Sequence, residues 1–188
     1  MSTPTNSHQL RHKWTLYFND PPKPTKHQVH KDDWHDALHT IALFDTVETF
    51  WRVCHNIPQP SDIPVKSAYY FFHTGIRPAW EDEANIGGGR FLCQFRKAAQ
   101  KYEDESIFFD MTLLIMCNQF PGIDFINGIG FNKERSRLEV WVRKGLNHAR
   151  VEALKQEMTD TLNTLFSIKN SKITLRANDF LYSQHKGR

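Results

Sequence analysis

The hydrophobic period changes once between residues 137 and 166, and this change restricts the fold more than any other feature of the chain. From Arg137 to Arg143 apolar and polar residues alternate, which is the pattern of a strand with one buried face. From Asn147 to Phe166 the apolar residues recur at helical spacing, with Asn147 as the expected N-cap. The chain therefore needs an apolar layer between a sheet and at least one helix.

Other segments repeat these two patterns. Strands are predicted over four further segments: Lys13–Asn19, Ser67–His73, Arg90–Arg96 and Ile173–Ala177. The glycine-rich segment Phe125–Phe131 is expected to form a strand edge or a bend. Two more helices are expected over Asp45–Cys54, with Asp45 as N-cap, and over Asp104–Gln119. Because no strand–helix–strand repeat is found, we predict an α+β fold, an antiparallel sheet with helices on one face.

Length and composition fit a single globular domain. The chain has 188 residues, of which 39% are apolar and 24% charged, so it can bury a core without disulfides or a structural metal. We expect residues 1–12 to form a flexible N-terminal segment and residues 13–188 to form one domain. The formal charge of +3 is a mild bias toward anionic partners.

Cysteine usage and the absence of targeting patterns indicate the compartment. The three cysteines show no C-x-x-C spacing, which favours a reducing environment. The first residues lack the pattern of a signal peptide, and no apolar run reaches the ~20 residues that span a bilayer. We therefore expect a protein of the cytoplasm or the nucleus.

Several familiar site patterns do not fit. The chain contains no phosphate-binding loop, nucleophile elbow or H-E-x-x-H motif. His35 and His39 stand four positions apart, but no third histidine or cysteine follows at standard ligand spacing, so no metal or cofactor is expected. Cys54 lies on the apolar stripe of its helix and is predicted to be buried and inert.

Two of the five tryptophans stand among charged residues, outside every apolar periodic segment. Trp34 and Trp80 each allow two interpretations, a platform in solvent or a ring buried in a small cluster under a loop. Trp80 is followed by Glu81, and a carboxylate beside an aromatic face can accept hydrogen bonds from N1 and N2 of guanine, an edge that adenine lacks. Methylation at N7 makes guanine cationic, which strengthens its stacking between two indoles.

Three segments resemble hallmark sequences of the eukaryotic translation initiation factor 4E family, the mRNA cap-binding proteins: FDTVETFW (44–51), GIRPAWEDE (75–83) and GGRF (88–91). The opening KWTLYF and the strand around Trp141 match in the same order, so the resemblance extends from His8 over nearly the whole chain. It implies a curved antiparallel sheet of about eight strands, with three main helices on the convex face and a cap slot on the concave face.

The resemblance also implies roles for individual residues in that slot. Trp34 and Trp80 would enclose the 7-methylguanine, while Glu81 would accept hydrogen bonds from N1 and N2 and the Trp80 amide would donate to O6. Trp141 would lie beside the N7 methyl group. The triphosphate would be held by four cationic side chains: Arg90, Lys133, Arg135 and Arg137. Glu134 departs from the family pattern here and would repel phosphate if it pointed inward.

A second surface is implied on the convex face, for an amphipathic helix of a 4G-type initiation scaffold protein or of a 4E-binding repressor. Helical spacing alone would place Val47 and Trp51 in the core, whereas the resemblance implies that both are exposed. The implied groove is completed by three residues of the next helix: Phe109, Asp110 and Leu113. His8 is followed by Gln9 where the family has a histidine–proline pair, which would alter recognition of the partner's tyrosine.

Three functions stay open on these grounds. The favoured one is a binding module that recruits capped mRNA to a scaffold for translation initiation and performs no bond chemistry. The second is a family member with weak cap binding that acts as an interaction protein or a translational repressor. The third is a hydrolase of the cap, which would need a metal-binding cluster of glutamates that we do not find in the sequence.

Overall fold

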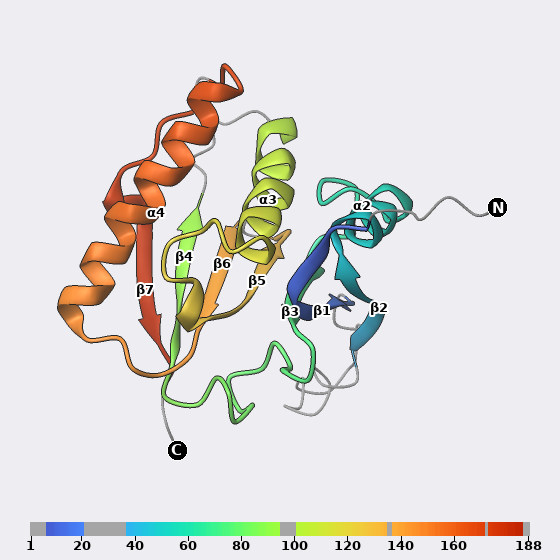
Figure 1. The fold of residues 1–188 in the computed structure, drawn as a ribbon, viewed down its shortest axis with the longest axis horizontal. Coiled ribbons are helices and arrows are strands. Elements are labelled where there is room, and N and C mark those ends of the chain that lie inside the picture. Colours follow the sequence, from blue (N-terminus) through green and yellow to red (C-terminus); the bar gives the residue numbers. More distant parts are fainter. Residues whose placement is uncertain (1–6, 21–36, 95–100, 135–136, 172, 186–188) are drawn as a thin grey trace.

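The computed structural model describes residues 7–20, 37–94, 101–134, 137–171 and 173–185. In these residues seven strands are found: β1 (Gln9–Asn19), β2 (Leu38–Thr46), β3 (Ala68–His73), β4 (Gly89–Gln94), β5 (Ile126–Asn132), β6 (Arg137–Val142) and β7 (Phe180–Gln184). They form one curved antiparallel sheet in the order β2-β1-β3-β5-β6-β4-β7 (Figure 1). The predicted α+β class is confirmed, with seven described strands where the resemblance implies about eight.

Among the described residues, three α-helices lie against one face of this sheet: α2 (Val47–Asn56), α3 (Lys101–Met116) and α4 (His148–Ile168). Two short 3₁₀ helices, η1 (Ile123–Phe125) and η2 (Ala177–Asp179), lie in the connections. In Figure 1, α2 lies beside β1 and β2, whereas α3 and α4 lie over the other strands. Side chains of all three helices belong to one buried core with one face of the strands, which confirms the helical layer that the sequence predicts.

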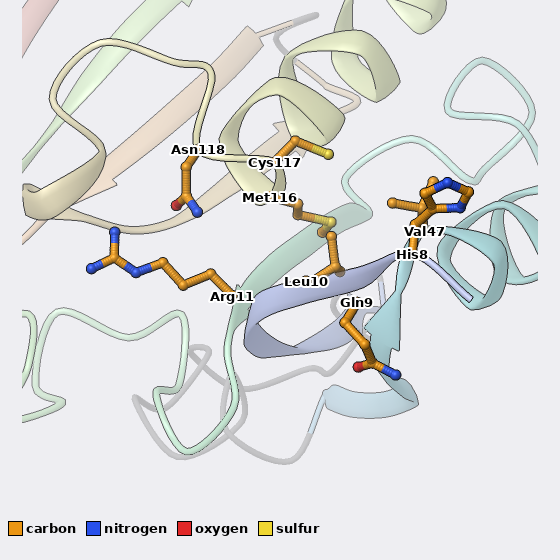
Figure 2. Close-up of a pocket in the computed structure, with 8 residues that line it drawn as sticks. All are labelled: His8, Gln9, Leu10, Arg11, Val47, Met116, Cys117 and Asn118. Carbon is orange, nitrogen blue, oxygen red and sulfur yellow. The ribbon is translucent and has the colours of Figure 1, made fainter. Parts of the chain in front are cut away.

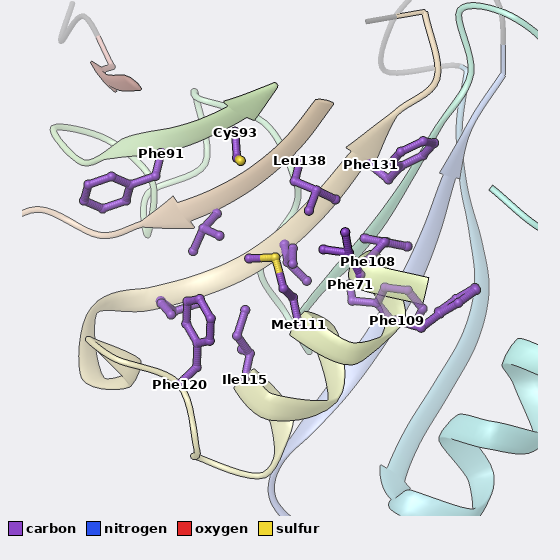
Figure 3. Close-up of a cluster of buried hydrophobic side chains, with 14 of the residues drawn as sticks. Phe71, Phe91, Cys93, Phe108, Phe109, Met111, Ile115, Phe120, Phe131 and Leu138 are labelled. Atoms are coloured by element: carbon purple, nitrogen blue, oxygen red, sulfur yellow. The ribbon is translucent and has the colours of Figure 1, made fainter. Parts of the chain in front are cut away.

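Alternation along the strands divides the side chains between two faces, as predicted. Leu138 and Val140 of β6 lie in the core under the helices, together with Phe71 of β3. Figure 3 shows Met111 and Ile115 of α3 in the same cluster. The core therefore lies between the helices and the sheet and leaves the opposite face of the sheet without a helical cover among the described residues.

Aromatic side chains form a smaller cluster on that helix-free face. Its buried members are Tyr17, Ala68, Tyr70, Phe72 and Trp141, and the half-buried residues packed against it are Leu38, Ile76 and Trp80. We call this group the front cluster. Its main members come from β1, β3 and β6, so it needs the sheet to be assembled before it can form.

The glycine-rich strand differs from its prediction. β5 is a central strand, paired with β3 on one side and β6 on the other, and is neither an edge nor a bend. A Cβ atom at Gly128 would lie 2.3 Å from Phe72 Cδ2, and one at Gly130 would lie 2.4 Å from Tyr70 Cδ1. The glycines are thus needed because the aromatic rings of the front cluster lie directly on the backbone of β5.

Three local predictions are corrected by the structure. The N-cap of α2 is Thr46, whose side chain accepts a hydrogen bond from the Thr49 amide at 3.2 Å, whereas Asp45 belongs to β2. β1 begins at Gln9, within the segment expected to be flexible. No strand forms at residues 173–177, and the last described strand follows η2 instead.

The other sequence-level expectations concern cysteine and membranes. Cys54 is buried, as predicted, and burial raises the pKa of its thiol to about 12. Within the described residues, no helix combines the length and apolar character that crossing a membrane requires.

Candidate functional site

The first candidate surface is built on the loop between β3 and β4, which carries Trp80 and Glu81. Both residues are half-buried, and the Trp80 ring packs against the front cluster. Pro78 and Ala79, which precede Trp80, are buried and fix the base of the loop. The Trp80 indole therefore lies at the edge of an aromatic layer and is neither sealed in the core nor isolated in solvent.

Side-chain hydrogen bonds hold this loop in one shape. Asn85 is fully buried, and its Nδ2 donates to the carbonyl oxygens of Arg77 and Ala79, at 2.9 Å each. The Asp82 carboxylate accepts from the backbone amides of Arg77 at 2.9 Å and Ala84 at 3.0 Å. The backbone on both sides of residues 80 and 81 is thus tied by polar contacts.

Asn127 of β5 joins the loop to the sheet. Its Nδ2 donates to Ala84 O at 2.8 Å and to Asn85 Oδ1 at 2.9 Å, and the side chain is buried. Sequence reasoning missed both asparagines. The available signal was a polar residue inside an otherwise apolar and glycine-rich strand, where an unpartnered amide would be costly.

A charged group lies next to Trp141 on the front face. Glu139, two positions before Trp141, accepts a hydrogen bond from the indole Nε1 at 3.3 Å. Arg90 Nη1 lies 3.0 Å from Glu139 Oε2, and Arg137 binds Oε1 of the same carboxylate through Nε at 3.0 Å and through Nη2. The predicted grouping of Trp141 with Arg90 and Arg137 is thus found, but around a carboxylate to which the sequence analysis assigned no role.

The Trp141 ring is fixed by further contacts. Its centroid lies 5.6 Å from the Phe72 ring at 68°, and 5.4 Å from Arg90 Cζ. The His185 ring centroid lies 4.8 Å from the Trp141 ring centroid, and His185 Nδ1 donates to Asn85 O at 3.0 Å. Burial lowers the pKa of His185. The sequence alone placed His185 only in a basic tail.

The remaining predicted cap contacts are not all brought together. Lys133 Nζ donates to Ser61 O at 2.5 Å, so this ammonium lies against the loop before β3 and does not join the Arg90 group. Glu134 is exposed. Trp34 and Arg135 lie outside the described residues.

The second candidate surface lies on the helix-bearing side. Val47 and Trp51 are half-buried on α2, and the Trp51 ring stacks on His55 with centroids 5.7 Å apart. His8 binds Glu48 through both its backbone amide and its Nδ1, the latter at 2.6 Å. These contacts attach the start of β1 to the first turn of α2.

A pocket of about 610 Å³ opens beside this attachment. It lies between the beginnings of β1 and α2 and the end of α3, and Figure 2 shows His8 and Val47 at one end and Arg11 and Asn118 at the other. Its lining is made of His8, Gln9, Leu10, Arg11, Val47, Met116, Cys117 and Asn118. His8 and Val47 were predicted for this surface. At the end of α3, however, the pocket is lined by residues 116–118 and not by the three residues predicted from the sequence.

Those three residues have different environments. Phe109 is buried in the core, and Leu113 is half-buried against it. Asp110 is paired with Lys169 just beyond the end of α4. Phe109 therefore supports the surface from below and presents little of its own area.

The chemistry available on the front face is that of recognition. Trp80 offers an aromatic face, Glu81 adds a carboxylate, and Arg90 places a guanidinium beside Trp141. This combination suits a flat ligand with hydrogen-bond donors at one edge and an anionic group nearby. Among the described residues, no group of three histidine, cysteine, aspartate or glutamate side chains could hold a metal ion.

The chain is similar to solved structures of eIF4E proteins. Ascaris suum eIF4E-3, solved with an m2,2,7G cap, is 26% identical with a TM-score of 0.74, and the match covers 96% of this chain and 92% of that one. C. elegans eIF4E-3, solved with the 4E-binding protein Mextli, is 26% identical with a TM-score of 0.72 and coverages of 96% and 95%.

Sequence relatives give the same answer. Residues 9–188 match the pattern of the family described as Eukaryotic initiation factor 4E, and the chain belongs to that family. Eukaryotic translation initiation factor 4E of Eremothecium gossypii is 34% identical over 139 residues, which are 72% of this chain and 63% of the relative. The factor 4E1 of Drosophila melanogaster is 31% identical over 159 residues, 82% of this chain and 58% of the relative. The matched segments thus span less than two thirds of these relatives' lengths.

Proposed function

We propose that this protein binds the 7-methylguanosine cap of mRNA on its front face and acts by binding alone, without bond chemistry. Trp80 is the proposed stacking face, Glu81 accepts from N1 and N2 of the base, and Trp34 supplies the second face. The observation that carries the proposal is the anchored loop, which holds Trp80 and Glu81 beside the front cluster through Asn85 and Asn127. Cap complexes of the similar Ascaris suum protein support it.

The phosphate end of the cap is assigned to Arg90, with Arg137 behind it. Arg90 Cζ lies 5.4 Å from the Trp141 ring, so an anion near this guanidinium could be attached to a base held beside Trp141. Lys133 has a smaller role in this proposal, because its ammonium is bound to Ser61 O. Arg135 is a further proposed contact to phosphate.

We further propose that the α2 surface recruits the capped mRNA to an initiation scaffold protein or to a 4E-binding repressor, in the cytoplasm. The half-buried Val47 and Trp51 and the adjacent pocket offer an apolar strip and a hollow to an amphipathic helix. Structures of similar proteins with Mextli and with 4E-BP support this assignment. The two surfaces lie on opposite faces of the sheet, so both ligands can bind at once.

The cap proposal is tested by titrating tryptophan fluorescence with 7-methyl-GTP and with GTP in parallel. We expect saturable quenching with 7-methyl-GTP and a much weaker response to GTP, because only the methylated base is cationic. Equal responses to the two nucleotides would contradict the stacking assignment. The absence of any response to 7-methyl-GTP, or of its retention on a 7-methyl-GTP resin, would instead favour the interaction-protein alternative.

A further inference from the structure

Glu139 is a buried carboxylate at the centre of the front face. Only 1% of the residue is exposed, although it lies on the face of the sheet that carries no helix. Both of its oxygens are used, Oε1 by Arg137 and Oε2 by Arg90 and the Trp141 indole. A buried carboxylate is stable only when it is paired, so these contacts are part of the folded site.

The pairing changes the charge that the site offers to a ligand. Arg90 and Arg137 carry two positive charges, and Glu139 cancels one of them at hydrogen-bond distance. The guanidinium of Arg137 is the more enclosed, with 12% of the side chain exposed against 31% for Arg90. An incoming anion therefore meets Arg90 first. Arg90 is already bound to the Glu139 carboxylate at that point.

Geometry limits how Arg90 can respond. Its Nη1 is bound to Glu139 and its Nε is buried without a hydrogen-bond partner in the described structure, so the second amino group is the edge left for a ligand. Moving the whole guanidinium to a phosphate would strip Glu139 of a partner inside the protein. Losing a partner from a buried charged group is costly, which opposes that movement.

We propose that Glu139 determines ligand specificity by holding Arg90 and Arg137 in place and cancelling one of their charges. Recognition of the methylated base then depends only weakly on how many phosphates follow it. Glu139 is a positioning residue in this account and does not touch the ligand. The inference rests on the proposed cap binding and concerns which part of the cap supplies the affinity.

The test compares the Kd of 7-methylguanosine with that of its 5′-triphosphate, for the wild type and for variants. The ratio of the two values is the readout, because a change in the folded fraction alters both values equally. Glu139→Gln keeps the size and one acceptor oxygen and removes the charge, so we expect the preference for the triphosphate to rise roughly tenfold. Glu134→Gln makes the same charge change at an exposed position of the neighbouring turn and should alter the ratio by less than about twofold.

Each outcome has one meaning. An unchanged or lowered ratio in Glu139→Gln, or an equal rise in Glu134→Gln, would overturn the proposed role of Glu139. If the wild type bound neither ligand, the cap-binding function itself would fail instead. Should Glu139→Gln not fold, the Arg137 Nε–H resonance of ¹⁵N-labelled wild type serves: it should stay in place when the triphosphate is added, and a shift showing release from Glu139 would refute the inference.

Discussion

The Trp141 indole donates to the Glu139 carboxylate at 3.3 Å, and both side chains come from the same face of β6. The Trp141 ring also lies edge-on to Phe72, with an angle of 68° between the two planes. The tryptophan is therefore oriented by a charged neighbour from its own strand. Removal of the Glu139 charge would therefore first displace the Trp141 ring on the front face.

Replacing Trp80 with alanine should reduce affinity for 7-methyl-GTP by about tenfold to a hundredfold, because one stacking face is lost. The ring is half-buried at the edge of the front cluster, so the protein should stay folded. Fluorescence titration and thermal unfolding measure the two effects. Trp80→Phe is the matched control, since it keeps a flat ring and should retain part of the affinity. Normal cap binding by Trp80→Ala would remove Trp80 from the site.

Replacing Trp51 with alanine should weaken binding of an amphipathic helical peptide by about tenfold or more, because large aromatic anchors dominate such interfaces. Cap affinity should not change, since Trp51 lies on the other side of the sheet. Isothermal titration with the peptide and with 7-methyl-GTP separates the two. Val65→Ala, at a residue that is 63% exposed in the connection between α2 and β3, serves as the control. If the peptide bound Trp51→Ala as it binds the wild type, Trp51 would be a packing residue only.

His73 should make the fold sensitive to acid. Burial, with smaller contributions from His12 and Arg143, lowers the pKa of His73 from 6.5 to about 4. Between these values the unfolded chain binds a proton that the folded chain does not, so the free energy of unfolding falls as the pH falls. The loss between pH 7 and pH 4.5 is on the order of 2 kcal/mol.

Urea unfolding of the wild type and of His73→Phe at both pH values isolates this contribution. Within the described part of the chain, His73 Nε2 has no hydrogen-bond partner, so replacement by phenylalanine removes no hydrogen bond at that atom. The variant should lose about 2 kcal/mol less than the wild type on acidification. Ser183→Ala, at an exposed position and without change of a titratable group, should leave the pH dependence unaltered. An identical pH dependence in wild type and His73→Phe would show that His73 titrates normally in the folded state.

Replacing Gly128 with alanine should destabilise the fold by about 1–3 kcal/mol, because the new methyl group would overlap the Phe72 ring and the Phe71 carbonyl oxygen. Differential scanning calorimetry should show a lower Tm. Ser183→Ala, at an exposed position of β7, provides a control with the same final residue. A Tm equal to that of the wild type would mean that Phe72 can move away freely, and that the front cluster is loosely packed.

Hydrophobic periodicity predicted the elements that bury one face in the core. The alternation in Arg137–Val142 and the apolar stripe of α4 are enforced by a single shared core, so local sequence carries the signal. The failures occur where distant segments decide the structure. β5 is central because the Tyr70 and Phe72 rings need the space above Gly128 and Gly130, which no local window contains.

In the candidate site, too, some residues could be assigned from the sequence, whereas contacts between distant residues could not. Trp80, Glu81, Trp141 and Arg90 were assigned through resemblance, and the structure gives their positions beside the front cluster. The polar scaffold between them was not predicted. Arg90 and Glu139 are 49 positions apart in the chain, and Asn85 and Asn127 are 42 apart, so their pairing is visible only after folding.

The link between Asn85 and Asn127 has a consequence for the energetics of ligand capture. A loop that is already tied to a central strand loses little conformational entropy when a ligand arrives, so more of the interaction energy remains as affinity. Trp80 and Glu81 are in this sense preorganised on the rigid part of the protein. Association on this side should then be fast, with the residence time of the ligand set by the contacts themselves.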